Sequence, residues 1–335
     1  MRIMLAPMEG VVDAEMRRLL TRLGGFDRCV TEFVRVTDVL LPERVFFRYC
    51  PELTTGSKTD SGVPVYVQLL GSNPAALAIN AVRAAQLGAA GIDLNFGCPA
   101  KTVNRHEGGS VLLREPGRVA AIVQAVRDAV PAEIPVCAKI RLGFDQRDGV
   151  LDIASGIERS GATELCIHAR TKTDGYKPPA YWSLVKQVTE CVSLPVIING
   201  EIWSVEDSRE ARQQSGSRHV MLGRGALSCP DLASRIKQTQ SGLPVTPLPW
   251  SDIAAEVARQ FDRSCELSPR HIGNRTKQWL AYLRREYTGA EKLFQSIKPL
   301  HDEVMIRELI RRHVDDDTAE NEQELSARKV VALAV

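Results

Sequence analysis

The chain has 335 residues, of which 44% are apolar and 25% charged, so it is long enough for one large globular domain and a smaller one. Its formal net charge of +2 excludes a strongly basic or acidic protein, so any basic surface must be local. The eight cysteines form no Cys-x-x-Cys pair and no Cys/His metal spacing, which favours a reducing compartment without disulfides or bound metal. Without a signal-peptide pattern or an apolar run of about 18 residues, the sequence predicts a cytoplasmic protein with no membrane span.

Short apolar runs of high β-propensity alternate with helix-like segments over the first 242 residues. The predicted strands, in chain order, are Ile3–Ala6, Cys29–Phe33, Val63–Leu70, Gly91–Phe96, Val136–Arg141, Glu164–Ala169, Pro195–Asn199 and His219–Gly223. Amphipathic segments such as 75–86 and 118–130 lie between them. Eight such alternations predict parallel strands joined by crossover helices, and their length fits a TIM (β/α)8 barrel better than an open sheet.

Polar side chains follow nearly every predicted strand. They include Pro7-Met8-Glu9, Arg35, Gln68, Asn95, Lys139 and His168. In a barrel these positions converge on one mouth, where barrel enzymes keep their sites. After the seventh and eighth runs, Asn199-Gly200-Glu201 and Gly223-Arg224-Gly225 offer glycine backbone N–H groups and a guanidinium, a combination typical of phosphate sites. The sequence therefore predicts a phosphorylated cofactor across the mouth, with Lys139 suited to an electron-rich ring edge.

The fourth predicted strand is followed by Gly97-Cys98-Pro99. Pro99 has no N–H group, so the hydrogen-bond ladder of the strand cannot continue there. A thiol at such a strand end can deliver a proton, because the cysteine pKa is about 8.5 when unperturbed. A free cysteine is more often a small buried apolar residue. From this pattern alone, a catalytic and a structural role for Cys98 both stay open.

The composition and the hydrophobic pattern of the sequence change after residue 242. The proline-rich stretch 243–250 predicts a linker, and residues 253–263, 274–287, 290–297 and 302–313 have helical patterns. Between Arg259 and Lys298 there are nine lysines and arginines but only four acidic residues. We therefore expect a barrel over 1–242, a small all-helical domain over 250–314, and an acidic tail over 315–335 whose composition is typical of disorder. From this pattern alone, the basic residues of the helical domain are equally compatible with nucleic-acid binding and with an ordinary solvated helix face.

Several motifs together resemble the tRNA-dihydrouridine synthases over nearly the whole chain. They are Leu5–Gly10, Thr31–Arg35, Val67–Gly71, Asp93–Pro99, Lys139–Gly143, His168–Thr171, Asn199–Ile202 and Gly223–Gly225. The segments Arg275–Leu280 and Leu283–Tyr287 are similar to the bacterial C-type branch, which acts on uridine 16 of the D-loop. The tail beyond about residue 315 has no counterpart in this resemblance.

The resemblance implies an FMN-dependent enzyme that takes electrons from NADPH and reduces a tRNA uridine, with hydride to C6 and a proton from Cys98 to C5. It implies FMN contacts from Pro7, Met8, Glu9, Gln68, Lys139, His168, Asn199, Gly200, Glu201, Gly223 and Arg224. It implies tRNA contacts from Arg35, Asn95 and Tyr176 at the base, and from Arg275, Lys277, Tyr282 and Lys298 elsewhere. We expect a monomer, although no pattern indicates the oligomeric state or a preference for NADPH over NADH.

Two other functions are compatible with parts of the sequence. A small-molecule flavoenzyme of the same fold, such as a dihydropyrimidine or dihydroorotate dehydrogenase, would explain the phosphate pattern and the cysteine but not the basic helical segment. An RNA-binding protein without redox chemistry would explain the basic segment alone. A comparison of activity on free uridine with activity on tRNA would distinguish the small-molecule flavoenzyme. A flavin absorption band in the purified protein would exclude the RNA-binding protein without redox chemistry.

Overall fold

The computed structural model describes residues 1–315. The chain divides into two compact units, which we describe separately. The first comprises Met1–Ala226 and Leu232–Leu243, and the second comprises Leu227–Asp231 and the chain from Pro244 onward. The acidic tail predicted over 315–335 lies, apart from its first residue, outside the described residues.

A closed parallel barrel forms the first unit, which confirms the predicted fold class. Its strands are β1 (Ile3–Leu5), β2 (Arg28–Val30), β3 (Val34–Arg35), β4 (Val65–Leu70), β5 (Ile92–Phe96), β6 (Val136–Arg141), β7 (Glu164–His168), β8 (Val196–Asn199) and β9 (His219–Leu222). They pair in the order β2-β1-β9-β8-β7-β6-β5-β4-β3, and a β2–β4 pairing closes the sheet on itself. All carboxyl ends therefore lie at one mouth.

The second barrel position is divided between two short strands. β2 and β3 both pair with β4, so nine strands fill eight positions. The single strand predicted over Cys29–Phe33 was wrong in its bounds, because β2 ends at Val30 and β3 begins at Val34. Between them the Thr31 Oγ1 accepts a hydrogen bond from the Gln68 N–H at 3.0 Å, so a side chain replaces a ladder carbonyl.

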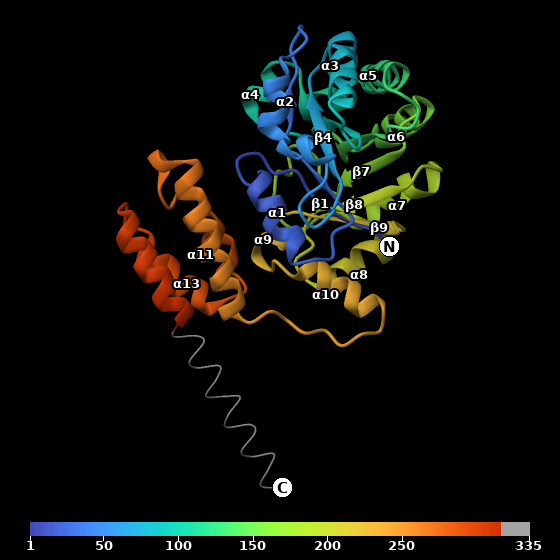
Figure 1. Cartoon of the computed structure of the whole chain (residues 1–335). Helices are drawn as coiled ribbons and strands as arrows, with labels where there is room; N and C mark the ends of the chain where they lie inside the picture. Colours follow the sequence, from blue (N-terminus) through green and yellow to red (C-terminus); the bar gives the residue numbers. More distant parts are fainter. Residues whose placement is uncertain (316–335) are drawn as a thin grey trace. The chain divides into compact units, whose positions relative to one another are not determined.

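Helices surround the strands in Figure 1. They are α1 (Ala14–Arg22), α2 (Glu43–Tyr49), α3 (Pro74–Gln86), α4 (Lys101–Arg105), α5 (Pro116–Ala129), α6 (Val150–Arg159), α7 (Trp182–Cys191), α8 (Val205–Ser215), α9 (Arg224–Ser228) and α10 (Leu232–Gln240), with the 3-10 turns η1 (Pro51–Thr55) and η2 (Gly109–Arg114). The helices predicted at 75–86 and 118–130 are confirmed as α3 and α5. Local chemistry starts α3, because Asn73 Oδ1 accepts from the Ala76 N–H and Pro74 occupies the first turn.

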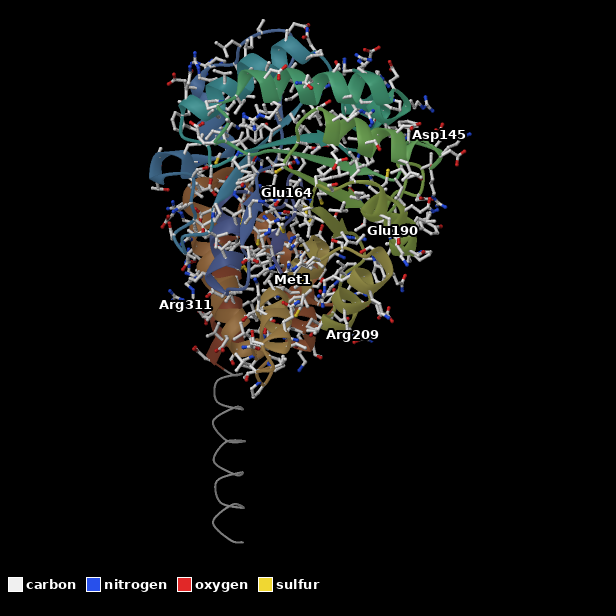
Figure 2. All side chains as sticks on the ribbon, turned by 90° about the vertical axis from the view of Figure 1, so that its right-hand side faces the viewer. Met1, Asp145, Glu164, Glu190, Arg209 and Arg311 are labelled. Carbon is white, nitrogen blue, oxygen red and sulfur yellow. The ribbon has the colours of Figure 1, made fainter. Side chains whose placement is uncertain are left out.

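The barrel interior is apolar at mid-height and charged at its amino end. The apolar layer consists of Met4, Ala6, Val30, Cys166, Ile197 and Met221. At the amino end, Glu164 accepts from Arg28 at 2.6 Å and also pairs with Arg2. Figure 2 shows Glu164 within the barrel ribbon, whereas Asp145 lies at its outer edge. Buried charges are tolerated there because each has a partner.

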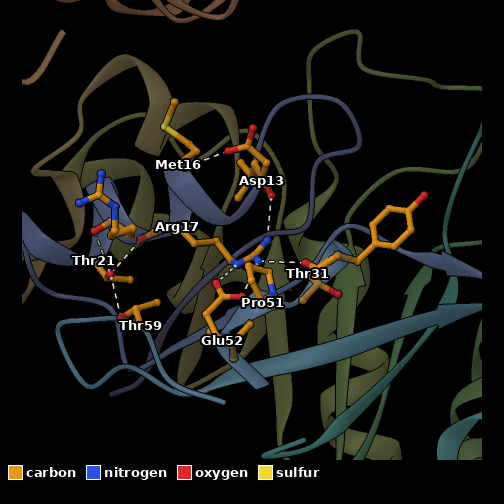
Figure 3. Close-up of polar contacts among 12 residues, drawn as sticks. Asp13, Met16, Arg17, Thr21, Thr31, Pro51, Glu52 and Thr59 are labelled. Atoms are coloured by element: carbon orange, nitrogen blue, oxygen red, sulfur yellow. Dashed lines mark hydrogen bonds and ion pairs between the residues drawn. The ribbon is translucent and has the colours of Figure 1, made fainter. Parts of the chain in front are cut away.

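A buried ion pair also fixes the first helix beside the barrel. Arg17 of α1 is fully buried and donates from Nε and Nη2 to both oxygens of Glu52 in η1, at 2.8 and 2.9 Å. Two of the remaining guanidinium N–H groups donate to the carbonyls of Val12 and Tyr49. Figure 3 shows this cluster, in which a hydrogen bond between Thr21 and Thr59 joins α1 to the chain that follows η1. These bonds give four of the five N–H donors of the buried guanidinium an acceptor.

The second unit is helical, as predicted. It contains α11 (Trp250–Leu267), the 3-10 turn η3 (Pro269–His271), α12 (Asn274–Leu283), α13 (Thr288–Ile297) and the helical residues 303–315. The helix predicted over 274–287 was too long, because the chain turns after Leu283. Gly289 then packs on the Trp250 indole, where a Cβ on residue 289 would lie 2.3 Å from Nε1. Trp279 is buried and donates from Nε1 to the Leu227 carbonyl at 3.1 Å.

No helix within residues 1–315 is long and apolar enough to cross a membrane. In the same part of the chain, no group of three or more His, Cys, Asp and Glu side chains is arranged to hold a metal ion. All eight cysteines are free thiols. Cys191 is exposed and Cys98 is partly exposed, whereas the other six are buried.

Candidate active site at the barrel mouth

A pocket opens at the carboxyl ends of the barrel strands. Its lining residues are Ala6, Pro7, Met8, Lys139, His168, Arg170, Tyr176, Asn199, Gly200, Glu201, Ile202, Trp203, Met221, Gly223, Arg224 and Gly225. They follow or end β1, β6, β7, β8 and β9. The structure therefore brings together all the residues expected to contact FMN except Glu9 and Gln68, and it adds Tyr176 to the same pocket.

Lys139 and Asn199 form the polar floor of the pocket. Lys139 Nζ donates to Asn199 Oδ1 at 3.1 Å, and Asn199 Nδ2 donates to the Met221 carbonyl at 2.8 Å. Burial lowers the pKa of the Lys139 ammonium from its usual value. One hydrogen bond to a neutral amide leaves this cation with donors for a bound group.

His168 is a neutral imidazole in this setting. Burial, reinforced by the positive charges of Arg141 and its neighbours, holds the pKa of His168 well below its usual range. Its ring centroid lies 5.8 Å from that of Tyr176. Gly200 has φ +112°, and a Cβ there would lie 2.7 Å from His168 Cδ2, so only glycine fits beside the imidazole. The ring is thus held without a charge of its own.

The loops after β8 and β9 lie against each other. A Cβ on Gly225 would approach the Ile202 carbonyl oxygen to 2.1 Å, so glycine is required for this contact. Arg224 lies 3.5 Å from a Glu201 oxygen and 5.0 Å from the Trp203 ring. The packed glycine backbone and one cation form a cradle suited to an anionic group such as a phosphate.

Glu201 organises the cations around this cradle. It pairs with the fully buried Arg170 and accepts from Trp203 Nε1 at 2.8 Å. Burial by itself would raise the pKa of Glu201, but the bonds from Arg170 and Trp203 lower it overall, so the carboxylate stays ionised. Its negative charge is directed at Arg170 and Arg224, where it fixes their positions.

Tyr176 lies over the pocket from the loop that follows β7. Its side chain is 53% exposed, and its ring lies 5.2 Å from the Arg141 guanidinium and 5.3 Å from that of Arg224. An exposed aromatic ring flanked by two cations offers a stacking surface for a planar, electron-rich ligand.

The Cys98 turn is held by hydrogen bonds on both sides. Asn95 Oδ1 accepts from the Cys98 N–H at 2.9 Å, and the Cys98 carbonyl accepts from Ser110 Oγ at 2.9 Å and Asn104 Nδ2 at 3.0 Å. Cys98 is partly buried beside an apolar cluster that includes Phe33. Burial raises the pKa of the Cys98 thiol, so the protonated form prevails at neutral pH.

Charged residues from other strand ends act on this thiol. Besides burial, the negative charge of Glu9 raises the pKa of Cys98, whereas Arg141 and Arg35 lower it. Glu9 and Arg35 are therefore close enough to Cys98 for an electrostatic effect, although neither lines the pocket. Gln68 is fully buried and lies below the turn, bonded to Asn95.

The basic residues predicted to bind RNA in the second unit differ in their surroundings. Lys277 donates from Nζ to the Leu300 carbonyl, and burial lowers the pKa of its ammonium. Arg275 donates to Gln278 at 3.2 Å and is half-buried. Tyr282 is half-buried, whereas Lys298 is exposed beside the Phe294 ring.

Sequence reasoning assigned no ligand contact to Arg170, Trp203 and Met221, which also line the pocket. Met221 had a usable signal, because it stands two residues before Gly223 and the predicted strand His219–Gly223 would place both on one face. Arg170 follows directly after a strand, but its partner Glu201 is 31 residues away and cannot be identified from spacing.

The fold and the pocket define a class of protein: a parallel-barrel enzyme whose site lies at the carboxyl ends of the strands. A 2-naphthoyl-CoA reductase in complex with 2-naphthoyl-CoA is similar, with a TM-score of 0.55, 14% identity and coverage of 72% of this chain and 50% of that chain. At this identity the likeness concerns the fold alone.

The chain belongs to the dihydrouridine synthase (Dus) family, whose model matches residues 4–314. The tRNA-dihydrouridine(16) synthase of Pseudomonas putida is 51% identical, over 92% of this chain and 96% of that protein. The tRNA-dihydrouridine(16) synthase of Shewanella oneidensis is 48% identical, over 94% of this chain and 100% of that protein. This membership confirms the family resemblance drawn from the motifs.

Proposed function

We propose that this protein reduces the C5–C6 bond of uridine 16 in the tRNA D-loop to 5,6-dihydrouridine, with FMN as cofactor and NADPH as electron donor. The observation that carries the proposal is the 51% identity to a tRNA-dihydrouridine(16) synthase over 92% of the chain. The pocket and the neighbouring thiol supply the groups that this reaction requires, as the following steps describe.

The pocket residues fit FMN by the chemistry of their donors. Arg224 and the glycine backbone after β8 and β9 would hold the phosphate, and Lys139 would face the pyrimidine edge of the ring, where reduction places negative charge. The remaining expected contacts, including Pro7 and Met8, line the same space. When bound, the reduced flavin supplies the hydride that adds to C6 of uracil.

Cys98 supplies the proton that C5 then requires. Because burial keeps the thiol protonated, Sγ can act as a general acid and leave as a thiolate. The charges of Arg141 and Arg35, which favour the ionised sulfur, stabilise that thiolate until solvent returns a proton. Proton transfer at one face and hydride addition at the other together saturate one double bond.

The uridine must leave its stack to reach a barrel pocket. Arg35 and Tyr176, at the mouth, would contact the everted nucleotide, and Asn95 would contact its base. In the second unit, Arg275, Lys277, Tyr282 and Lys298 would contact the tRNA backbone, which predicts binding that weakens with salt. Lys277 already bonds to a backbone carbonyl, so we expect it to contribute less than Lys298.

Mapping dihydrouridine in tRNA tests the proposal directly. In a strain lacking this gene, position 16 should carry unmodified uridine, and restoring the gene should return dihydrouridine there. The purified protein should show a flavin absorption band and oxidise NADPH in the presence of unmodified tRNA. Activity on free uridine or uracil but not on tRNA would support a small-molecule flavoenzyme, and RNA binding without flavin would support a protein without redox chemistry.

A further inference from the structure

A chain of side-chain hydrogen bonds runs from the barrel interior to the Cys98 turn. Asp93 Oδ2 accepts from Gln68 Nε2 at 2.6 Å, and Gln68 Oε1 accepts from Asn95 Nδ2 at 2.8 Å. Asn95 Oδ1 then accepts from the backbone N–H groups of Gly97 and Cys98, at 3.0 and 2.9 Å. Three side chains on two neighbouring strands, β4 and β5, thus connect one buried carboxylate to the turn.

The chemistry of the two ends gives this chain a single direction. An ionised carboxylate only accepts hydrogen bonds, so Gln68 must direct its NH2 group at Asp93 and its oxygen at Asn95. The backbone N–H groups of the turn only donate, so Asn95 must direct its oxygen at them and its NH2 group at Gln68. Every donor in this series of hydrogen bonds therefore meets an acceptor only when both amides have the observed orientation.

Burial makes the carboxylate hard to replace by water. Asp93 is 2% exposed and Gln68 is fully buried. Without Asp93, the NH2 group of Gln68 would be buried with no acceptor. Buried donors without an acceptor reorient to find another partner. If Gln68 reorients, Asn95 loses the bond that holds its amide plane.

The charges around Asp93 favour a role inside the barrel rather than in the pocket. Arg28 on β2 and Lys139 on β6 attract its carboxylate, and Glu164 on β7 repels it. Asp93 does not line the pocket. Its hydrogen bonds lead to the Cys98 turn, and its charge also raises the pKa of Lys139 in the pocket.

We propose that Asp93 is a positioning residue for proton transfer: through Gln68 and Asn95 it holds the turn that presents Cys98 Sγ to the uracil ring. The proposal rests on the proposed function for the identity of the proton acceptor. Ser110 and Asn104 hold the carbonyl side of Cys98. Asp93 secures the opposite, N–H side, where Arg141 Nε also donates to the Gly97 carbonyl at 2.8 Å, so its loss weakens that side of the turn.

Two measurements on purified, flavin-loaded protein test this role. The first is the rate at which iodoacetamide alkylates Cys98, followed by mass spectrometry of the peptide that contains it. The second is kcat and KM for tRNA and for NADPH. Glu164→Gln is the matched control, because Glu164 is also a buried barrel carboxylate but bonds to Arg28 instead of the turn.

Asp93→Ala should raise the Cys98 alkylation rate several-fold and lower kcat for tRNA by about 10–100-fold, the scale of a small misplacement of a reacting group. KM for NADPH should stay unchanged. Asp93→Asn keeps an acceptor oxygen at the same distance, so it should restore both measurements to within about threefold of wild type. Glu164→Gln should leave Cys98 alkylation at the wild-type rate.

Wild-type alkylation and kcat in Asp93→Ala would overturn the proposal. If that variant does not fold, Asp93→Glu replaces it, because one added methylene displaces Gln68 while keeping the charge; wild-type values in Asp93→Glu would then overturn the proposal. If the wild-type protein forms no dihydrouridine, the proposed function fails, yet the alkylation rates still decide whether Asp93 holds the turn.

Discussion

The two ends of the barrel use similar residues in opposite ways. At the amino end, Glu164 is paired with Arg28 and Arg2, so its charge is satisfied within the protein. At the carboxyl end, Lys139 has one neutral partner, and Arg224 has one carboxylate partner, Glu201 at 3.5 Å, and lies over the exposed Tyr176 ring at the edge of a pocket. The comparison teaches that ligand capacity depends on how many partners a charged group already has, rather than on which residue it is.

The cysteines show the same contrast. Burial raises the pKa of Cys137, near the amino end, to about 12, and that of Cys166, in the apolar layer, also to about 12. Cys98 also has a raised pKa, but it is partly exposed and surrounded by charged strand-end residues. Of these three thiols, Cys98 alone is placed to exchange a proton with a ligand at the mouth.

Removing the thiol at the mouth should have the largest effect. Cys98→Ala should slow tRNA-dependent oxidation of the reduced flavin by about 10²–10⁴-fold, because general acid catalysis is lost. Reduction of the flavin by NADPH should continue at the wild-type rate. Stopped-flow absorbance of the two half-reactions measures both, with Cys191→Ala as the exposed-thiol control. Equal rates in Cys98→Ala and wild type would contradict the assignment of the proton.

Breaking the ion pair at the amino end should change stability instead of chemistry. Glu164→Ala should lower the free energy of unfolding by about 3–5 kcal/mol, because it leaves the buried Arg28 charge without its partner. Urea titration followed by circular dichroism measures the change. The rate per folded molecule should stay at the wild-type value, and a loss of kcat in fully folded protein would contradict the division between the two ends.

Arg224 tests the anion cradle. Arg224→Ala should weaken FMN binding by about 10–100-fold, the range expected for losing hydrogen bonds to a charged group. Arg224→Lys keeps the charge but not the fork, so its affinity should be intermediate. Quenching of flavin fluorescence on titration with apoprotein measures both. If riboflavin, which lacks the phosphate, loses affinity as much as FMN does, Arg224 does not contact the phosphate.

The smallest effect concerns the pH dependence of stability. The folded-state pKa of His168 is lowered by burial, so its contribution to stability is present above about pH 6.5 and is lost as pH falls toward the folded-state pKa. Below pH 6.5 this loss approaches about 1.4 kcal/mol per pH unit. His168→Asn should flatten the fall in unfolding free energy between pH 6.5 and 5, measured by urea titration. An unchanged slope would show that other groups set it.

Much of the fold and the strand-end residues could be predicted from sequence, because hydrophobic periodicity and strand order place them. The division between β2 and β3 could not, since it involves a tertiary bond that the Gln68 N–H donates to Thr31 Oγ1. The surroundings of Lys277 also escaped prediction: the resemblance implied a tRNA contact, but its ammonium bonds to the Leu300 carbonyl. Helical spacing describes a face and does not reveal what a later segment brings to it.

Asn95 shows a similar limit within the candidate site. Its place three residues before Cys98 marked it as polar and close to the thiol, and the resemblance implied a contact with the base. The structure adds that its oxygen is already committed to the backbone of the turn. Its NH2 group does not bond to the turn but donates to Gln68 Oε1. Sequence spacing cannot show which partner the oxygen and the NH2 group of an amide each take.

The chain enters the second unit twice, at Leu227–Asp231 and again from Pro244 onward. Trp279 bonds to the carbonyl of Leu227, and the Leu248 N–H bonds to Asp231 Oδ2 at 2.8 Å, so the early segment is part of that unit's own framework. A single cut near residue 250 would therefore separate these partners. Chimeras that exchange the helical unit between relatives should carry both segments, with α10 kept from the barrel parent.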